Sequence, residues 1–352
     1  MGRTLPLEEI NPGMVTAVPV LTANQKVVLQ ENIELTSHMI NLLHRWNIKE
    51  ICIKGERHRK HSESIGNPSH DDFIKPYGQA VQEAKKTFEY MRRSEKVPYS
   101  DFYKLAYGTL YELTCQKNVL SNLYRLKAPV DYMYLHAVDV GVIAGLIGRW
   151  CALGEADIKK LILAGVMHDV GKSQNPLYIL ERPELPTTEQ MDALKLHPTY
   201  GYYMVKSIPG IELEVQQAIL QHHERENGSG YPLGSTADGI HAFAKILAIA
   251  DVYDAMTSNR VYKSSVTPFV ALDTLASEIV THFERKYCEI FIGNSLKTLI
   301  NATVLLSDHS QAKVVSFNSF LSVKPIVQKN DGQLIDLNEP GTVSIVEIVN
   351  FP

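Results

Sequence analysis

Residues 161–172 read LILAGVMHDVGK, and this stretch carries the pattern that decides the fold. An apolar helical run leads into a His–Asp doublet, His168 and Asp169, and a glycine and a lysine follow at the end of the helix. A second apolar helical stretch, residues 246–253 (ILAIADVY), carries Asp251. The helical pattern extends from Tyr77 to about Asn301, so the centre of the chain is predicted to be an all-α domain.

The two flanks of this helical region have different patterns. Short β-branched runs at residues 15–28 and 50–54 flank a helical pattern at residues 32–46, which predicts a small α/β module. After Thr303 apolar residues alternate, and residues 330–332 (NDG) predict a tight hairpin turn. The expected fold class is therefore mainly α. The predicted domains are an α/β module with a polar linker at 1–75, a helical domain at 76–302 and a small β module at 303–352.

Composition excludes several classes of protein. The chain has 352 residues, of which 45% are hydrophobic and 21% charged, so it is not a disordered chain. A net charge of -4 argues against a long nucleic acid as the main partner. Four scattered cysteines, and the lack of an apolar export segment or a bilayer-spanning run, predict a soluble cytoplasmic protein without membrane insertion. The basic run at residues 57–61 is interpreted as a solvated loop, with an anion contact as the alternative.

Histidine placement is the most informative feature of the helical region. Five histidines lie in or at the ends of its predicted helices: His136, His168, His197, His222 and His223. Two positions are doublets, His168–Asp169 and His222–His223, and neighbouring side chains on a helix diverge by about 100°. Such doublets can serve two neighbouring ions, whereas one ion would not need them. Asp251 also requires a cation, because an unpaired charge in a core costs several kcal/mol.

The donor count indicates a catalytic metal centre. Five imidazoles, Asp169 and Asp251 give seven ligands, which form eight bonds if Asp169 bridges. Two octahedral ions need about twelve bonds, so about four positions stay open for a hydroxide and for substrate. Imidazole and carboxylate without thiolate suit Fe, Mn, Ni, Co or Zn rather than Ca or Mg. Any one of these histidines alone is more often a hydrogen-bonded core residue than a ligand. The joint pattern favours two divalent transition-metal ions; Fe or Mn is the expectation, with Ni, Co or Zn as the alternatives.

Two segments resemble the signatures of a known family. Residues 168–172 (HDVGK) and 222–232 (HHERENGSGYP) are similar to the two motifs of the HD-GYP family, an offshoot of the HD phosphohydrolase superfamily. The similarity extends over about residues 107–301 and includes 134–136, 197–198 and 251–260 in the family's order. It implies an all-helical HD-type domain whose metal cluster hydrolyses cyclic dinucleotides. The resemblance implies cyclic di-GMP as the chief substrate, with linear pGpG as the product and GMP as a further product left open.

The resemblance also implies a role for individual residues. One ion would be bound by His136, His168, Asp169 and Asp251, and the other by Asp169, His197, His222 and His223. Asp169 then bridges the ions, and Lys172 assists catalysis at a phosphate oxygen, although a lysine after a glycine is often only a solvated helix end. Substrate would be contacted by Gly230, Tyr231, Pro232, Asp254, Arg260 and Lys263. A plain turn, for the first three, and surface ion pairs, for the last three, are the alternatives.

The sequence departs from the family pattern at a few positions. Asn227 stands where the family usually has Asp, and residues 259–261 (NRV) replace a common Asp-Arg-Pro, which we expect to change loop electrostatics but not to abolish activity. Tyr132 occupies the position where some members have a glutamate for a third ion, and Asp131 is about 100° off that face. Two metals are therefore predicted. A non-catalytic cyclic dinucleotide receptor, or a hydrolase of another cyclic dinucleotide such as cGAMP, is the alternative function, and a homodimer is left open.

Overall fold

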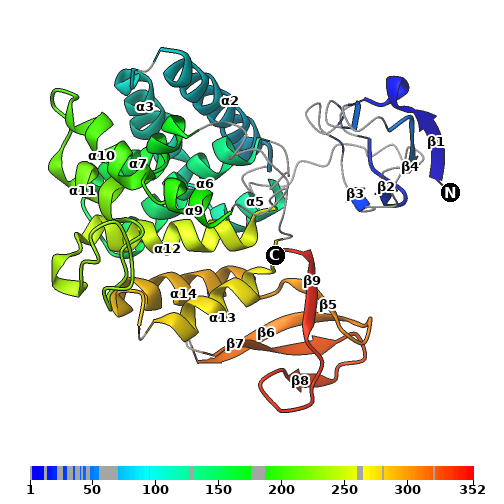
Figure 1. Ribbon diagram of the computed structural model, residues 1–352. Helices are drawn as coiled ribbons and strands as arrows, with labels where there is room; N and C mark the ends of the chain where they lie inside the picture. Colours follow the sequence, from blue (N-terminus) through cyan, green and yellow to red (C-terminus); the bar gives the residue numbers. More distant parts are fainter. Residues whose placement is uncertain are drawn as a thin grey trace. The chain divides into compact units, whose positions relative to one another are not determined.

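The structure is a computed structural model and describes residues 2–11, 14–21, 27–29, 35, 40, 43–44, 48–54, 70–94, 96–126, 131–175, 187–259, 265–279, 281–319 and 322–352. The chain divides into two units, residues 1–66 and residues 67–352. Figure 1 shows the helices and strands of each unit.

The first unit contains two small antiparallel strand pairs. Strand β1 (Gly2–Pro6) pairs with β4 (Glu50–Lys54), and β2 (Val20–Leu21) pairs with β3 (Val27–Leu29). The strand predicted at residues 50–54 is confirmed, whereas β1 was not predicted. Most of the helix predicted at residues 32–46 lies outside the described residues. The small core of this unit includes Leu5, Leu7, Ile10, Val20, Leu35, Leu43, Ile51 and Ile53.

The second unit is mainly helical, which confirms the predicted fold class. Its helices are α2 (His70–Ser94), α3 (Tyr99–Leu105), α4 (Tyr111–Thr114), α5 (Val119–Leu126), α6 (Tyr132–Trp150), α7 (Glu155–Met167), α9 (Thr188–Leu194), α10 (His197–Lys206), α11 (Leu213–Gln221), α12 (Ala242–Thr257), α13 (Pro268–Glu278) and α14 (Arg285–Leu299). The π-turn η2 (Ala106–Leu110) joins α3 to α4, and η3 (Val170–Gln174) and η4 (Ala237–Gly239) are short 3-10 turns. Within the described residues, the helices are too short or too polar to cross a bilayer.

Helix α6 is the centre of the helical packing. Every residue from His136 to Gly148 is buried, so helices cover this part of α6 on all sides. A Cβ atom added to Gly165 of α7 would lie 2.5 Å from the Cα atom of Gly141 in α6, so the two backbones touch where these helices cross. Helix α12 also packs against α6. These contacts bring the first turn of α6, the end of α7 and the middle of α12 together.

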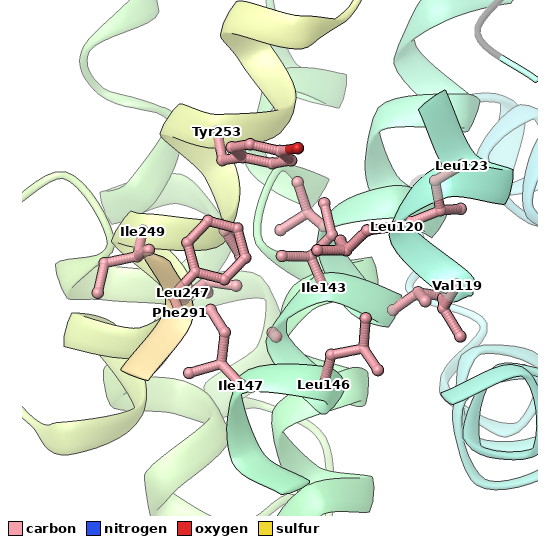
Figure 2. Close-up of a cluster of buried hydrophobic side chains, with 14 of the residues drawn as sticks. Val119, Leu120, Leu123, Ile143, Leu146, Ile147, Leu247, Ile249, Tyr253 and Phe291 are labelled. Carbon is pink, nitrogen blue, oxygen red and sulfur yellow. The ribbon is translucent and has the colours of Figure 1, made fainter. Parts of the chain in front are cut away.

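Apolar side chains from four helices hold this arrangement. Figure 2 shows Leu120 of α5, Ile143 and Ile147 of α6, Tyr253 of α12 and Phe291 of α14 in one cluster. The rings of Tyr253 and Phe291 meet edge to face, with their centroids 4.9 Å apart. Burial of each large apolar side chain contributes about 1.5–3 kcal/mol. Since residues two apart on a helix point in nearly opposite directions, the burial of Tyr253 turns the residue two positions earlier, Asp251, away from this cluster.

A five-stranded antiparallel sheet follows the helices. Its strands are β5 (Thr303–Leu306), β6 (Gln311–Ser319), β7 (Ser322–Lys329), β8 (Leu334–Asp336) and β9 (Ile345–Asn350), in the order β8-β7-β6-β5-β9. The predicted turn at residues 330–332 is confirmed: it connects β7 to β8, and Gly332 has a positive φ of 90°. Val304, Leu306, Val314 and Val327 belong to the same buried cluster as the helical core. The domain boundaries at residues 76 and 303 stay predictions.

Candidate metal centre

The helix ends place seven side chains around one point of the second unit. His136 lies one turn into α6, His168 and Asp169 follow α7, and Asp251 lies in α12. His197 begins α10, and His222 and His223 follow α11. All except His223 are buried, and His223 is partly exposed. The structure therefore brings together all seven residues that the sequence singled out.

The donor atoms form two groups. In the first group, His136, His168 and Asp251 place one ligand atom each within 4.8 Å of one another, and Nε2 of His136 lies 3.2 Å from Oδ1 of Asp251. In the second group, His197, His222 and His223 also place one ligand atom each within 4.8 Å of one another. A third set, His168, Asp169 and His222, meets the same limit and overlaps both groups, so the division between two ions that the family resemblance implies stays a prediction.

Asp169 lies between the two groups. Its Oδ1 atom is 3.1 Å from Nε2 of His197, which belongs to the second group. Its Oδ2 atom is 3.3 Å from Nε2 of His168 and 3.9 Å from Nε2 of His136, which belong to the first group. Each oxygen of this carboxylate therefore faces a different group, as a bridging ligand requires.

Hydrogen bonds to the main chain fix three of the imidazole rings. The Nδ1 atoms of His168, His197 and His222 lie 2.7, 2.7 and 2.8 Å from the carbonyl oxygens of Gly165, Leu194 and Ile219. A carbonyl oxygen only accepts, so each Nδ1 carries the hydrogen and donates it. In the neutral rings, Nε2 then presents its lone pair to the centre. The Nε2 atoms of His197 and His222 are 3.2 Å apart, and two facing lone pairs repel each other unless a proton or a metal ion lies between them.

The electrostatics of the centre suit a cation. Burial, with the neighbouring His223, holds the pKa of His222 well below its usual range. Burial likewise lowers the pKa of His223. For Asp169, burial raises the pKa, but the neighbouring His168 and Lys172 outweigh it and hold the pKa well below its usual range. Neutral imidazoles and an ionised carboxylate are the protonation states in which these groups bind metal.

Asp254 has a different position from the one predicted. It was expected to contact substrate, but its side chain is fully buried and its Oδ2 atom accepts a hydrogen bond of 2.7 Å from Nδ1 of His136. Burial lowers the pKa of His136, but hydrogen bonds to Asp251 and Asp254 outweigh this and raise the pKa to about 9. Asp254 therefore orients the imidazole of His136, and the prediction that it contacts substrate is wrong.

The loop after α11 lies beside the second group. A Cβ atom on Gly230 would lie 2.5 Å from the carbonyl oxygen of His223 and from Cα of Glu224, so the loop passes too close to the main chain for any larger residue. The next residue, Tyr231, stacks its ring on His223, with centroids 4.6 Å apart and planes at 27°. Pro232 follows through a cis peptide bond. The predicted substrate loop thus forms one wall of the centre.

Glu224 has a role that the sequence did not reveal. Its side chain is only 2% exposed, and its two oxygens accept hydrogen bonds from the main-chain N–H groups of Leu233 (2.7 Å) and Ser235 (2.9 Å). These bonds tie the far end of the loop to the residue that follows the His222–His223 pair. Only its place directly after this pair could have drawn attention to Glu224, because most glutamates are exposed.

Lys172 lies at the rim of the centre. It belongs to η3, directly after the His168–Asp169 doublet, and its ammonium group contacts Oδ2 of Asp169 at 2.5 Å. Its side chain remains 29% exposed, so the charge faces both the centre and the solvent. The two other predicted substrate contacts with a positive charge, Arg260 and Lys263, lie outside the described residues.

Comparisons with known proteins point to the same part of the chain. A family model described as an HD domain matches residues 114–286, a range that contains all seven side chains. A cyclic di-GMP phosphodiesterase of Pseudomonas aeruginosa is 32% identical over 247 residues, which cover 66% of this chain and 58% of that protein. The cyclic di-GMP phosphodiesterase PdeB of Borreliella burgdorferi is 23% identical over 334 residues, 92% of this chain and 88% of that protein. This chain therefore spans less than two thirds of the Pseudomonas relative.

A solved structure shares the fold. An HDG"Y"P protein from Bdellovibrio bacteriovorus matches with a TM-score of 0.54 at 14% sequence identity, and the match covers 84% of this chain and all of that one. At this level of identity the likeness concerns the fold alone. It supports the helical arrangement that brings the donor groups together.

Proposed function

Since the helical part of this chain belongs to the HD-GYP family of HD domains, we propose that the protein is a metal-dependent phosphodiesterase that hydrolyses cyclic di-GMP. The reaction opens the ring to linear pGpG, and hydrolysis of the second phosphodiester would give GMP. The observation that carries this proposal is the pair of donor groups joined by Asp169. Two relatives described above, 32% and 23% identical to this chain, are cyclic di-GMP phosphodiesterases.

The donor chemistry fits two divalent transition-metal ions. Nitrogen ligands of one such ion, each about 2.0–2.1 Å from it, lie about 3 Å apart, close to the 3.2 Å between Nε2 of His197 and Nε2 of His222. His136, His168 and Asp251 would hold one ion, His197, His222 and His223 the other, and Asp169 would bind both. Imidazoles and carboxylates without thiolate suit Fe, Mn, Ni, Co or Zn, and we propose Fe or Mn as the ions to be tested first.

The residues beside His136 support two ions and not three. Tyr132, one turn earlier on α6, stacks its ring on the imidazole of His136, with centroids 5.2 Å apart and planes at 16°. The nearest acid, Asp131, forms an ion pair of 2.9 Å with Lys85. A phenol ring therefore fills the position from which a further carboxylate would reach the centre.

The protein's own groups would position and stabilise the phosphate. When bound, the two ions neutralise phosphate charge and supply a hydroxide nucleophile. The ammonium group of Lys172 can contact a non-bridging oxygen as negative charge develops. Burial, with the charge of Asp251, raises the pKa of Tyr231, so its hydroxyl stays protonated and can donate a hydrogen bond to a second phosphate oxygen.

The test is a chromatographic assay of the purified chain loaded with Mn or Fe. We expect cyclic di-GMP to be converted to pGpG, and we expect His168→Ala and Asp169→Ala to abolish turnover without unfolding the domain. His309→Asn is the matched control, because His309 is an exposed histidine in the turn between β5 and β6. Turnover that survives both changes at the centre would refute the proposal.

The same assay distinguishes two other functions from the proposed one. Tight binding of cyclic di-GMP without product after hours would identify a receptor in place of an enzyme. Faster hydrolysis of cGAMP than of cyclic di-GMP, measured side by side, would change the substrate and keep the reaction. The open ligand positions of a seven-donor centre argue against a pure receptor, since a binder has no need of them.

A further inference from the structure

We infer that the two ion positions are unequal, and that Asp254 makes the position at His136 the tighter one. The inference rests on the proposed metal centre and deepens it. It assigns Asp254 a positioning role, since this carboxylate acts on the centre through the imidazole of His136.

The first observation concerns the hydrogen-bond partners of the ring nitrogens. His168, His197 and His222 each donate from Nδ1 to a neutral main-chain carbonyl. His136 instead donates from Nδ1 to the carboxylate of Asp254, at 2.7 Å. A negatively charged acceptor leaves more electron density on the imidazole than a neutral one, so Nε2 of His136 becomes the stronger ligand.

The second observation concerns the way Asp254 is held. Its side chain is fully buried, and its other oxygen, Oδ1, accepts a hydrogen bond of 3.1 Å from the hydroxyl of Ser258. Asp251, which faces the centre, lies one turn earlier on the same helix, α12. One helix therefore supplies a direct ligand and, three residues later, the group that orients a second ligand.

The third observation is the distribution of carboxylates. The first group, His136 and His168 with Asp251, has three carboxylates within reach: Asp251, the shared Asp169 and, behind His136, Asp254. The second group has three imidazoles: Asp169 lies 3.1 Å from His197, and Asp251 reaches the group only at 3.8 Å, from its Oδ2 to Nδ1 of His223. A divalent cation is attracted more strongly where more negative charge surrounds it.

The exposure of the histidine side chains also favours tighter binding at the first position. The side chain of His223, in the second group, is 18% exposed, whereas those of His136 and His168 are 3% and 1% exposed. An ion at the second position is therefore closer to solvent. The first ion binds tightly and stays, and the second exchanges, so activity follows the supply of the second ion.

The experiment is a calorimetric titration of the chelator-stripped full chain with Mn²⁺, without nucleotide. For the wild type we expect two resolved binding events of different affinity. Asp254→Asn keeps the size of the side chain and an oxygen that can accept from Nδ1, and it removes the charge. We expect this change to weaken the tighter event by about 10- to 100-fold and to leave the weaker event unchanged.

His197→Ala is the complementary variant. It removes a donor from the second group, so the weaker event should disappear and the tighter one should remain. Circular dichroism of each metal-free variant checks that it is folded. If Asp254→Asn does not fold, Ser258→Ala replaces it, and the loss of the hydrogen bond to Oδ1 should weaken the tighter event by a smaller factor.

Three results would overturn the inference: two identical events in the wild type, equal weakening of both events by Asp254→Asn, or loss of the same event in Asp254→Asn and His197→Ala. The titration contains no substrate, so it is independent of the phosphodiesterase assay. Unequal binding without hydrolysis of cyclic di-GMP would refute the proposed function and leave the inference intact.

Discussion

Glu224→Gln should weaken the attachment of the substrate loop without changing the metal ligands. The two oxygens of Glu224 each accept one main-chain hydrogen bond, from Leu233 at 2.7 Å and from Ser235 at 2.9 Å. Glutamine has nearly the same shape but only one accepting oxygen. Its amide nitrogen is a donor and would face a second donor, the remaining N–H of the loop.

The magnitude follows from the burial of this side chain. At 2% exposure, the amide cannot turn to water, so one N–H of the loop loses its partner. An unsatisfied group of this kind costs about 1–3 kcal/mol. The fraction of molecules in which the loop is detached from residue 224 should therefore rise about 5- to 150-fold over the wild type. We expect KM for cyclic di-GMP to rise, and we expect Mn²⁺ content to stay unchanged, because Glu224 is not among the seven donors.

Amide hydrogen exchange is the assay. The N–H groups of Leu233 and Ser235 should exchange faster in Glu224→Gln by the same 5- to 150-fold or so, while amides in the middle of α6 should not change. Asp238→Asn is the matched control, since it removes the charge of an exposed acid in the neighbouring turn η4. If the two loop amides exchanged at the wild-type rate, the carboxylate would not hold this loop and the reasoning would be wrong.

Further predictions concern packing, catalysis and the ions. Gly165→Ala places a methyl group 2.5 Å from Cα of Gly141, so denaturant unfolding should show a loss of at least about 1–3 kcal/mol; an unchanged midpoint would count against the close crossing of α6 and α7. Lys172→Met should lower kcat by about 10²- to 10³-fold in steady-state assays, at a metal content, counted by mass spectrometry, equal to that of the wild type. A kcat near that of the wild type would remove Lys172 from catalysis. Chelation of the ions should lower Tm in scanning calorimetry, because an ion at 100 times its Kd stabilises the fold by about 2.7 kcal/mol; an unshifted Tm would contradict metal binding by the folded state.

The sequence predicts which side chains the fold brings together at the centre, for a physical reason. Histidines at helix ends and an aspartate in an apolar helix are costly to bury without a cation, so His168, Asp169 and Asp251 are informative even before any contact is known. The roles of Asp254 and Glu224 could not be predicted in the same way. They depend on which neighbour each carboxylate meets after burial, and spacing along one helix or loop does not specify this.

Some elements of the fold could likewise be predicted from the sequence, and others could not. Helical periodicity identifies the centre of the chain, and alternation with a turn at residues 330–332 identifies the C-terminal strands. Helix α2 begins at His70, seven residues before the predicted start at Tyr77, and Pro76 lies inside the helix. Strand β1 was missed because residues 2–6 contain one β-branched residue, Thr4, and depend on pairing with β4, about fifty residues away in sequence.

Chromatography of cyclic di-GMP after incubation with a sample whose bound Mn or Fe has been counted is the most direct test of the central claim. We predict two ions per chain and a steady accumulation of linear pGpG. Two bound ions with intact cyclic di-GMP, or pGpG formation at an undiminished rate after the ions are removed, would contradict it.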